Sequence, residues 1–282
     1  MIELPVLEYH VAHNCNLSCE QCSHYSNFHP TVPMPTPEET AEEYAAWSGR
    51  LRPGRFALLG GEPTLNPRLV EHVRLARKAW PDSELMLVSN GLLLHRHPDL
   101  PRVLVDTDCR LDVSQHGTAR RYMKEFAKVK RLLRRWRAEY PGIRIEIRKS
   151  HRRWMRQYRI VDGKPMPFSS DPGVAYGICM QKTCTQLYRG CLWKCPAVAY
   201  FSTMERKLNL QGTAQWQLSR DYHACLPSAA DVRVEAFIVT NAIPQCALCP
   251  ATRSNDKRHN CLTDPSAATT SHVSYTYSQF RG

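Results

Sequence analysis

Three cysteines stand close together near the start of the chain, in the stretch Cys15-Asn16-Leu17-Ser18-Cys19-Glu20-Gln21-Cys22. Three thiolates at this spacing could hold three irons of a [4Fe–4S] cluster and leave the fourth iron open for a small molecule. A structural zinc site would ordinarily take a fourth protein ligand. The triplet therefore favours an iron–sulfur cluster, with a zinc knuckle or unrelated free thiols as the alternatives.

A second motif, Gly60-Gly61-Glu62-Pro63, directly follows the apolar run Phe56-Ala57-Leu58-Leu59. Together the two motifs resemble the radical S-adenosylmethionine (SAM) superfamily, whose barrel carries such a cysteine triplet after its first strand and a Gly-Gly-Glu-Pro motif after its second. The resemblance implies that SAM chelates the open iron of the cluster held by Cys15, Cys19 and Cys22. Reductive cleavage of SAM would then give a 5′-deoxyadenosyl radical.

The same resemblance supplies a set of residues that would contact SAM: Gly60, Gly61, Glu62, Pro63, Ser89, Asn90, Ser114, Gln115 and Arg148. Glu62 would accept a hydrogen bond from the SAM ammonium, and Arg148 could pair with its carboxylate. Simple capping of strand ends, or a surface position for Arg148, is the alternative. Because Gln21 stands where the superfamily often has an aromatic residue, adenine contacts could fall to Tyr25 or Phe28.

Eight further cysteines lie between Cys179 and Cys261. The spacing of Cys179, Gly190 and Cys195 resembles the auxiliary-cluster domains called SPASM and its short, single-cluster form, twitch. A zinc ribbon is the alternative for this half. One cluster needs four ligands, whereas five cysteines are suitably placed: Cys179, Cys184, Cys195, Cys246 and Cys249. Either Cys184 takes no part and Cys246 and Cys249 both ligate, or one of the five thiols is free beside the cluster.

Strands and helices are predicted to alternate through the first half of the chain. The pattern predicts strands over residues 6–11, 55–59, 84–89, 110–114 and 143–147, and helices over 36–47, 66–80, 100–106 and 118–140. Such alternation makes parallel βαβ units of an α/β fold. The resemblance implies a partial (β/α)6 barrel over residues 1–150, a twitch-type auxiliary domain over 151–262 and a tail over 263–282, with the chemistry at the carboxyl ends of the strands.

Composition narrows the class of protein. The chain has 282 residues, 43% of them hydrophobic, and no apolar run approaches the roughly 20 residues of a membrane span. Without a secretory signal, we expect a cytoplasmic protein, in which twelve cysteines favour metal ligation over disulfides. The net charge of +12 concentrates in residues 120–137 and 148–159, and the first stretch reads as the solvated face of a helix. A zinc-stapled basic module that binds nucleic acid is the non-enzyme alternative.

An auxiliary cluster with a spare thiol beside it resembles the twitch-type radical SAM epimerases of aminoglycoside biosynthesis. There the adenosyl radical removes a hydrogen from one face of a carbon and a thiol, here Cys249, returns one from the other, as in the change of neomycin C to neomycin B. The resemblance implies that Cys249 is the free thiol and that the ligands of the second cluster are Cys179, Cys184, Cys195 and Cys246. It also implies two [4Fe–4S] clusters, SAM, an aminoglycoside substrate and an external one-electron donor such as flavodoxin or ferredoxin.

Two other enzymes fit the same motifs. A twitch-type dehydrogenase would oxidise an aminocyclitol alcohol and would need four cluster ligands without a donor thiol. A peptide-modifying enzyme is disfavoured because no leader-binding segment is visible. The basic charge of the chain argues against an aminoglycoside, because a polycationic substrate should prefer an acidic cleft. Net charge is not local charge, however, and four carboxylates near the strands could face the mouth of the barrel: Glu3, Glu8, Asp112 and Glu146.

Overall fold

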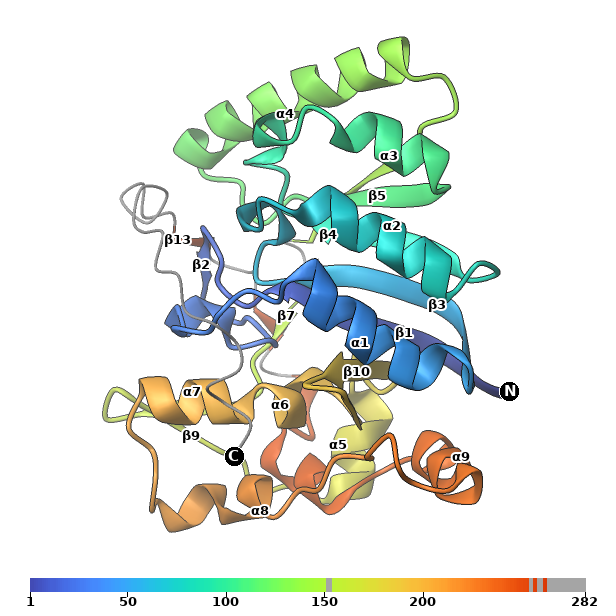
Figure 1. The fold of residues 1–282 in the computed structure, drawn as a ribbon. Helices are drawn as coiled ribbons and strands as arrows, with labels where there is room; N and C mark the ends of the chain where they lie inside the picture. Colours follow the sequence, from blue (N-terminus) through green and yellow to red (C-terminus); the bar gives the residue numbers. More distant parts are fainter. Residues whose placement is uncertain (151–153, 254–255, 258–260, 263–282) are drawn as a thin grey trace.

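A seven-stranded sheet organises the structure (Figure 1). The computed structural model describes residues 1–150, 154–253, 256–257 and 261–262, so the predicted tail over 263–282 lies outside the described residues. The strands follow the order β11-β10-β1-β3-β4-β5-β6, and all neighbours are parallel except β10 and β11. Their bounds are β1 Ile2–Ala12, β3 Leu51–Gly60, β4 Glu84–Ser89, β5 Cys109–Ser114, β6 Ile145–Arg148, β10 Cys184–Tyr188 and β11 Cys191–Trp193. Because β11 and β6 are both edges, the sheet is open, and the predicted α/β fold with a partial barrel is confirmed.

Four helices connect the first five parallel strands and cover one face of the sheet (Figure 1). They are α1 Pro37–Ser48, α2 Leu69–Ala79, α3 Leu100–Asp106 and α4 Arg120–Glu139, with short 3₁₀ helices at Ser26–Phe28, Pro63–Leu65 and Leu94–Arg96. The main apolar core lies between these helices and the sheet. This layer leaves the other face of the sheet as the inner face of the barrel.

Helix α1 begins where the sequence predicts it. The Thr36 side chain accepts from the backbone N–H of Glu39, and the Glu39 carboxylate accepts from the N–H of Thr36 at 2.8 Å, which forms the predicted capping box. Pro37 takes the first helical position, where no N–H is needed. The helix then buries Tyr44 and Trp47 against the sheet.

Strand β1 separates the two faces by simple alternation. Leu7, Tyr9 and Val11 belong to the core under the helices. Glu8 and His10 alternate with these residues and point to the inner face. There the Glu8 carboxylate accepts a hydrogen bond from Gln186 of β10 at 2.6 Å. The pleat of one strand therefore fixes both the core and the polar lining of the barrel.

The second half of the chain joins the same sheet. Strand β10 pairs with β1, with Val6 opposite Cys184 and Tyr9 opposite Leu187, and the Trp47 indole donates to the Gly190 carbonyl at 2.9 Å. A sixth parallel strand thus comes from the segment assigned to the auxiliary domain, so hydrogen bonds cross the proposed boundary after residue 150. The other elements of this half are β7 Trp154–Met155, β8 Arg159–Val161, β9 Lys164–Met166, α5 Pro172–Ile178, α6 Pro196–Ala199, α7 Phe201–Lys207, α8 Gln217–Arg220, α9 Asp231–Val239 and 3₁₀ helices at Ala214–Trp216 and Pro244–Leu248.

Three short antiparallel pairings lie outside the main sheet, one of them between β8 and β9. Strand β2 (Ser18–Cys19) pairs with β13 (Cys261–Leu262), which sets residue 261 opposite Cys19 in register, and β12 (Asp256–Lys257) pairs with β7. Within the described part of the chain, no helix has the length and apolar character required to cross a bilayer.

Candidate functional site

The Gly60-Gly61 turn holds the cysteine loop against the end of β3. The N–H of Gly61 donates to the Ala12 carbonyl at 2.9 Å, and that of Glu62 donates to the Asn14 carbonyl at 2.8 Å. A Cβ at Gly60 would lie 2.0 Å from the Ala12 oxygen, and one at Gly61 would lie 2.2 Å from the Asn14 oxygen. The glycines are therefore needed for close approach to the chain's own loop, whereas the sequence suggested close approach to a ligand.

Glu62 lies at the centre of the predicted SAM contacts. Its fully buried carboxylate accepts from the Ser89 hydroxyl at 2.6 Å, from the Asn90 N–H at 2.7 Å and from both the N–H and the hydroxyl of Thr64. Burial raises the pKa of Glu62, although these four hydrogen bonds oppose that rise. The structure thus brings Glu62, Ser89 and Asn90 together at the carboxyl ends of β3 and β4.

The sulfur of Cys15 faces hydrogen-bond donors. The Leu17 N–H lies 3.4 Å from it and the Asn90 amide nitrogen lies 4.0 Å from it. The same Asn90 amide donates to the Asn16 side-chain oxygen at 2.7 Å, so the end of β4 is tied to the cysteine loop. Donors around a thiolate sulfur are a common way in which proteins tune an iron–sulfur cluster.

The other two cysteines of the triplet each meet a histidine. The Cys19 sulfur lies 3.8 Å from Nδ1 of His116. Burial would raise the pKa of Cys22, but hydrogen bonding and the charge of His24 outweigh it and lower that pKa. Burial would likewise lower the pKa of His24, yet Cys22 and Glu8 raise it to about 9. A cysteine beside a histidinium favours the thiolate, which is the form that binds iron.

Ser114 and Arg148 lie at the carboxyl ends of β5 and β6, opposite each other in register. The Arg148 guanidinium forms an ion pair with the fully buried carboxylate of Asp112, which also accepts from Arg110 at 2.8 Å. Arg148 is thus partly exposed at the strand ends and already paired. The pairing of Arg148 with the SAM carboxylate stays a prediction.

Three of the four expected carboxylates share the inner face. Glu8 lies near His24, with 3.9 Å between Glu8 Oε2 and His24 Nε2, while Asp112 and Glu146 lie beside Arg110. Glu3 does not join them. It lies at the amino end of β1, exposed, 4.0 Å from Arg52, because that end of a parallel strand faces away from the site. The prediction for Glu3 is therefore wrong.

The five cysteines of the second set gather on the other side of β1. Cys179 follows α5, Cys184 begins β10, Cys195 caps α6, and Cys246 and Cys249 lie in and just after the 3₁₀ helix Pro244–Leu248. Burial raises the pKa of each, and each lies within electrostatic reach of others of the set.

Cys184 and Cys249 occupy different surroundings within this set. Cys249 interacts with Cys195, Cys179 and Cys246, and burial is the main reason that its pKa is raised well above the usual value. Its thiol lies 3.1 Å from the Gln157 side-chain oxygen, to which it donates. The Cys184 thiol forms a hydrogen bond with the Glu8 carboxylate on the inner face of the barrel. Both are therefore candidates for the surplus thiol.

Tyr25 links the two cysteine sets. It is buried within the loop that carries the triplet, and its electrostatic neighbours include Cys22 on one side and Cys195 and Cys249 on the other. Its ring and that of Phe28 pack against Tyr158, with 6.2 Å and 5.6 Å between ring centres. The two aromatics proposed for adenine contacts thus lie toward the second half of the chain.

Both cysteine sets have the donor chemistry that four-iron clusters require. Among the residues that the structure describes, no three His, Cys, Asp or Glu side chains form a group able to hold a single metal ion. In a [4Fe–4S] cluster each cysteine binds a different iron, so wider spacing is appropriate. Cys15, Cys19 and Cys22, each beside a nitrogen donor, fit a cluster with one open iron.

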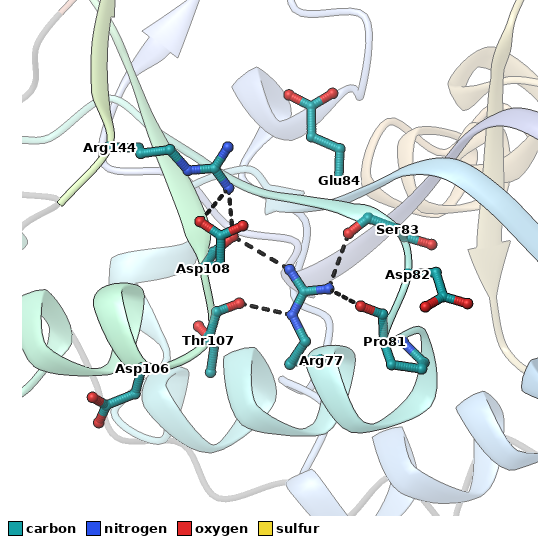
Figure 2. Close-up of a pocket in the computed structure, with 9 residues that line it drawn as sticks. All are labelled: Arg77, Pro81, Asp82, Ser83, Glu84, Asp106, Thr107, Asp108 and Arg144. Carbon is teal, nitrogen blue, oxygen red and sulfur yellow. Dashed lines mark hydrogen bonds and ion pairs between the residues drawn. The ribbon is translucent and has the colours of Figure 1, made fainter. Parts of the chain in front are cut away.

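A cleft of about 530 Å³ lies at the opposite end of the sheet, among residues that precede β4, β5 and β6 (Figure 2). At its centre Arg77 donates to the carbonyls of Thr107 at 2.7 Å, Pro81 at 2.6 Å and Ser83 at 3.0 Å, and also reaches those of Trp80 and Asp108. These carbonyls follow α2 and α3, so Arg77 closes the ends of both helices. Arg77 thus acts as a structural clamp between the ends of the two helices, and the cleft around it is remote from the candidate site.

We expect Arg77→Met to lower the free energy of unfolding by about 2–4 kcal/mol, because it leaves these carbonyls without their charged donor. Urea unfolding of the anaerobically purified protein, followed by circular dichroism, measures the change. Arg74→Met, at an exposed position on the same helix, is the matched control and should change stability by less than about 0.5 kcal/mol. Equal effects of the two substitutions would contradict the clamp.

Several residues around the site carry no signal that sequence reasoning used. Thr64 and Asn16 complete the hydrogen bonds of Glu62 and Asn90. His116, two residues beyond β5, and Gln157, in the loop after β7, reach cysteine sulfurs far away in sequence. Position immediately after a predicted parallel strand could have pointed to His116. Gln157 follows no such strand.

Comparison with known proteins finds one family model that matches the first half of the chain. Residues 9–146 match the model of the radical SAM superfamily. No curated protein matches the sequence. The crystal structure of BtrN in complex with AdoMet and 2-DOIA is similar over 87% of this chain and 91% of that one, with a TM-score of 0.51 and 15% identity, which shows the fold alone.

Two further solved structures are similar to smaller parts of the chain and have lower TM-scores. Native anSMEcpe with bound AdoMet matches 51% of this chain at 20% identity and a TM-score of 0.40, and the match spans only 43% of that protein. SuiB of Streptococcus suis bound to S-adenosylmethionine matches 78% of this chain and 68% of its own length, at 10% identity and a TM-score of 0.34.

Proposed function

From the radical SAM domain of residues 9–146 we propose that this protein is an epimerase that inverts one carbon stereocentre of an aminoglycoside, in a reaction of the neomycin C to neomycin B type. One observation carries the proposal. Five buried or half-buried cysteines lie together beside the barrel where a four-iron cluster takes four, which leaves one thiol for hydrogen transfer.

The residues divide into three groups in this proposal. Cys15, Cys19 and Cys22 hold one [4Fe–4S] cluster, and Cys179, Cys184, Cys195 and Cys246 hold a second. When bound, the two clusters would provide single-electron chemistry, for the reductive cleavage of SAM at the first and for the reduction of a spent thiol at the second. Glu62 and its neighbours Ser89 and Asn90 form the fixed hydrogen-bonded frame against which SAM is oriented.

Cys249 is the hydrogen donor. Its thiol is half-buried and donates its hydrogen to the Gln157 oxygen, 3.1 Å away. A hydrogen atom given to the substrate from this side completes the inversion, since the first hydrogen leaves from the side of SAM. One electron and one proton then restore the thiol, so each inversion consumes two external electrons and one SAM.

The comparisons support a SAM enzyme with a small polar substrate. The fold is shared with BtrN, which was crystallised with AdoMet and 2-DOIA, over 91% of BtrN. On the inner face, Glu8 and its partners Gln186 and His24 offer groups that can bind hydroxyl and ammonium groups of a sugar.

A dehydrogenase is the second candidate, and one observation favours it. Cys249 interacts with Cys179, Cys195 and Cys246, whereas Cys184 interacts with Glu8. If those four ligate, no donor thiol remains at Cys249 and the substrate radical would lose an electron instead. The product would then be two hydrogens lighter than the substrate.

Turnover of neomycin C in heavy water distinguishes the two candidates. For the epimerase we expect a product of inverted configuration that carries one deuterium at the inverted carbon, because a cysteine thiol exchanges its hydrogen with solvent. Mass spectrometry and NMR measure both properties. Unlabelled inverted product would exclude a thiol donor, and a product two mass units below the substrate would establish the dehydrogenase.

A further inference from the structure

Helix α4 lies on the outside of the sheet (Figure 1), and its exposed side chains form an unusual basic face. Its buried residues Tyr122, Phe126, Val129, Leu133 and Trp136 pack toward the sheet. Its exposed residues include two glutamates, Glu125 and Glu139, against nine basic side chains, Arg120, Arg121, Lys124, Lys128, Lys130, Arg131, Arg134, Arg135 and Arg137.

Folding does not account for this charge. Within the described residues only Lys128 and Arg135 of the nine form ion pairs with acidic side chains. Arg120 and Arg121 lie in the first turn, which holds no acidic residue, although the helix dipole favours negative charge there. Like charges four residues apart, as at Arg120 and Lys124, also oppose helix formation. A basic face that lowers the stability of its own helix is suited to an acidic partner.

The amino end of α4 is connected to the first cysteine set. The backbone N–H of His116 donates to the Tyr122 hydroxyl, in the first turn of α4, at 2.9 Å. The His116 ring in turn approaches the Cys19 sulfur, with 3.8 Å between Nδ1 and Sγ. Two residues, Tyr122 and His116, therefore link the first turn of α4 to a proposed cluster ligand.

We infer that the amino-terminal part of α4, centred on Arg120, Arg121 and Lys124, is the docking surface for an acidic one-electron carrier protein of the flavodoxin class. One electron would leave the carrier and, by way of His116 and Cys19, would reduce the cluster that Cys15, Cys19 and Cys22 would hold. The inference rests on the proposed radical chemistry in requiring that electron, and it holds for an epimerase or a dehydrogenase alike.

Charge reversal on the intact enzyme tests the surface. The variant Arg120→Glu/Arg121→Glu/Lys124→Glu is compared with Arg131→Glu/Arg134→Glu/Arg135→Glu, which makes the same change of charge at the far end of the same helix. The formation of 5′-deoxyadenosine from SAM is measured with reduced flavodoxin and, separately, with dithionite. Because SAM cleavage is the readout, the result does not depend on which product the enzyme makes.

With reduced flavodoxin we expect the first variant to be slower by about 10-fold or more and the second by less than about threefold, since steering depends on local charge. With dithionite both should stay within twofold of the unsubstituted enzyme. An unchanged flavodoxin-driven rate in the first variant overturns the inference. So does an equal loss in both variants, which indicates only a general effect of charge.

A milder variant and a series of salt concentrations test the surface even if the first variant misfolds. If the first variant also loses dithionite-driven cleavage, Arg121→Ala/Lys124→Ala is measured instead, together with the unsubstituted enzyme between low and moderate salt. A flavodoxin-driven rate that does not fall with salt overturns the inference. A variant that loses DNA binding but keeps its flavodoxin-driven rate would assign the face to nucleic acid and reject the carrier. Absence of any dithionite-driven cleavage in the unsubstituted enzyme refutes the radical chemistry itself.

Discussion

Replacing Cys249 with alanine is expected to reduce formation of inverted product by about 100-fold or more while SAM cleavage continues, because hydrogen removal and hydrogen return would be separate steps served by different residues. The variant should still bind about eight irons per chain, as two four-iron clusters require. Anaerobic assays of 5′-deoxyadenosine, inverted product and iron measure the three quantities on one preparation.

Cys184→Ala and Cys191→Ala make this result interpretable. Cys184 is a proposed ligand, so its loss should lower the iron content toward about four. Cys191 lies beside Cys225 and Glu43, away from the second set, and its loss should change neither iron nor product. If Cys249→Ala loses iron and Cys184→Ala keeps it, the roles are exchanged and Cys249 is a ligand.

Gly61→Ala is expected to remove the first cluster. The new Cβ would lie 2.2 Å from the Asn14 carbonyl oxygen, and Gly61 is itself held by its bond to the Ala12 carbonyl, so the cysteine loop must move. We expect about four irons per chain instead of about eight, and SAM cleavage lowered about 100-fold or more. Iron analysis and the absorption spectrum of the anaerobic protein measure the first effect, and release of 5′-deoxyadenosine the second.

Gly49→Ala is the matched control, because a Cβ at Gly49 meets nothing within 4 Å and its backbone is in the ordinary helical region. It should retain both clusters. A Gly61→Ala variant that binds eight irons and cleaves SAM normally would show that the loop can yield without loss of its ligands, contrary to the geometry described.

The first half of the fold could be read from the sequence because local rules and the fold agree there. The Thr36 capping box and the limits of β4 and α3 are as predicted. Strands β1 and β3 begin earlier than predicted, at Ile2 and Leu51, and each contains a proline in the added part. Proline lacks an N–H, which suggests a break, but in these strands the pairing continues on both sides of it.

The second half could not be read in the same way, because its pairing is long-range. Strand β10 is five residues long, and nothing local indicates that Cys184 lies opposite Val6. The cysteine pattern indicated which residues are candidates for a second cluster site, since metal-ligand spacing is a local property. It could not predict that Gln157 and Tyr25 border Cys249, because those contacts depend on how distant segments pack.

The hydrogen bonds between β1 and β10 have a consequence for stereochemistry. The loop after β1 carries the side from which hydrogen would be removed, and β10 leads into the region from which it would be returned. Because β1 and β10 are paired in one ladder, we expect the two sides to keep their relative position between the steps. The handedness of the product would then depend on the orientation in which the sugar enters, and a substrate bound the other way round would be inverted at a different carbon or not at all.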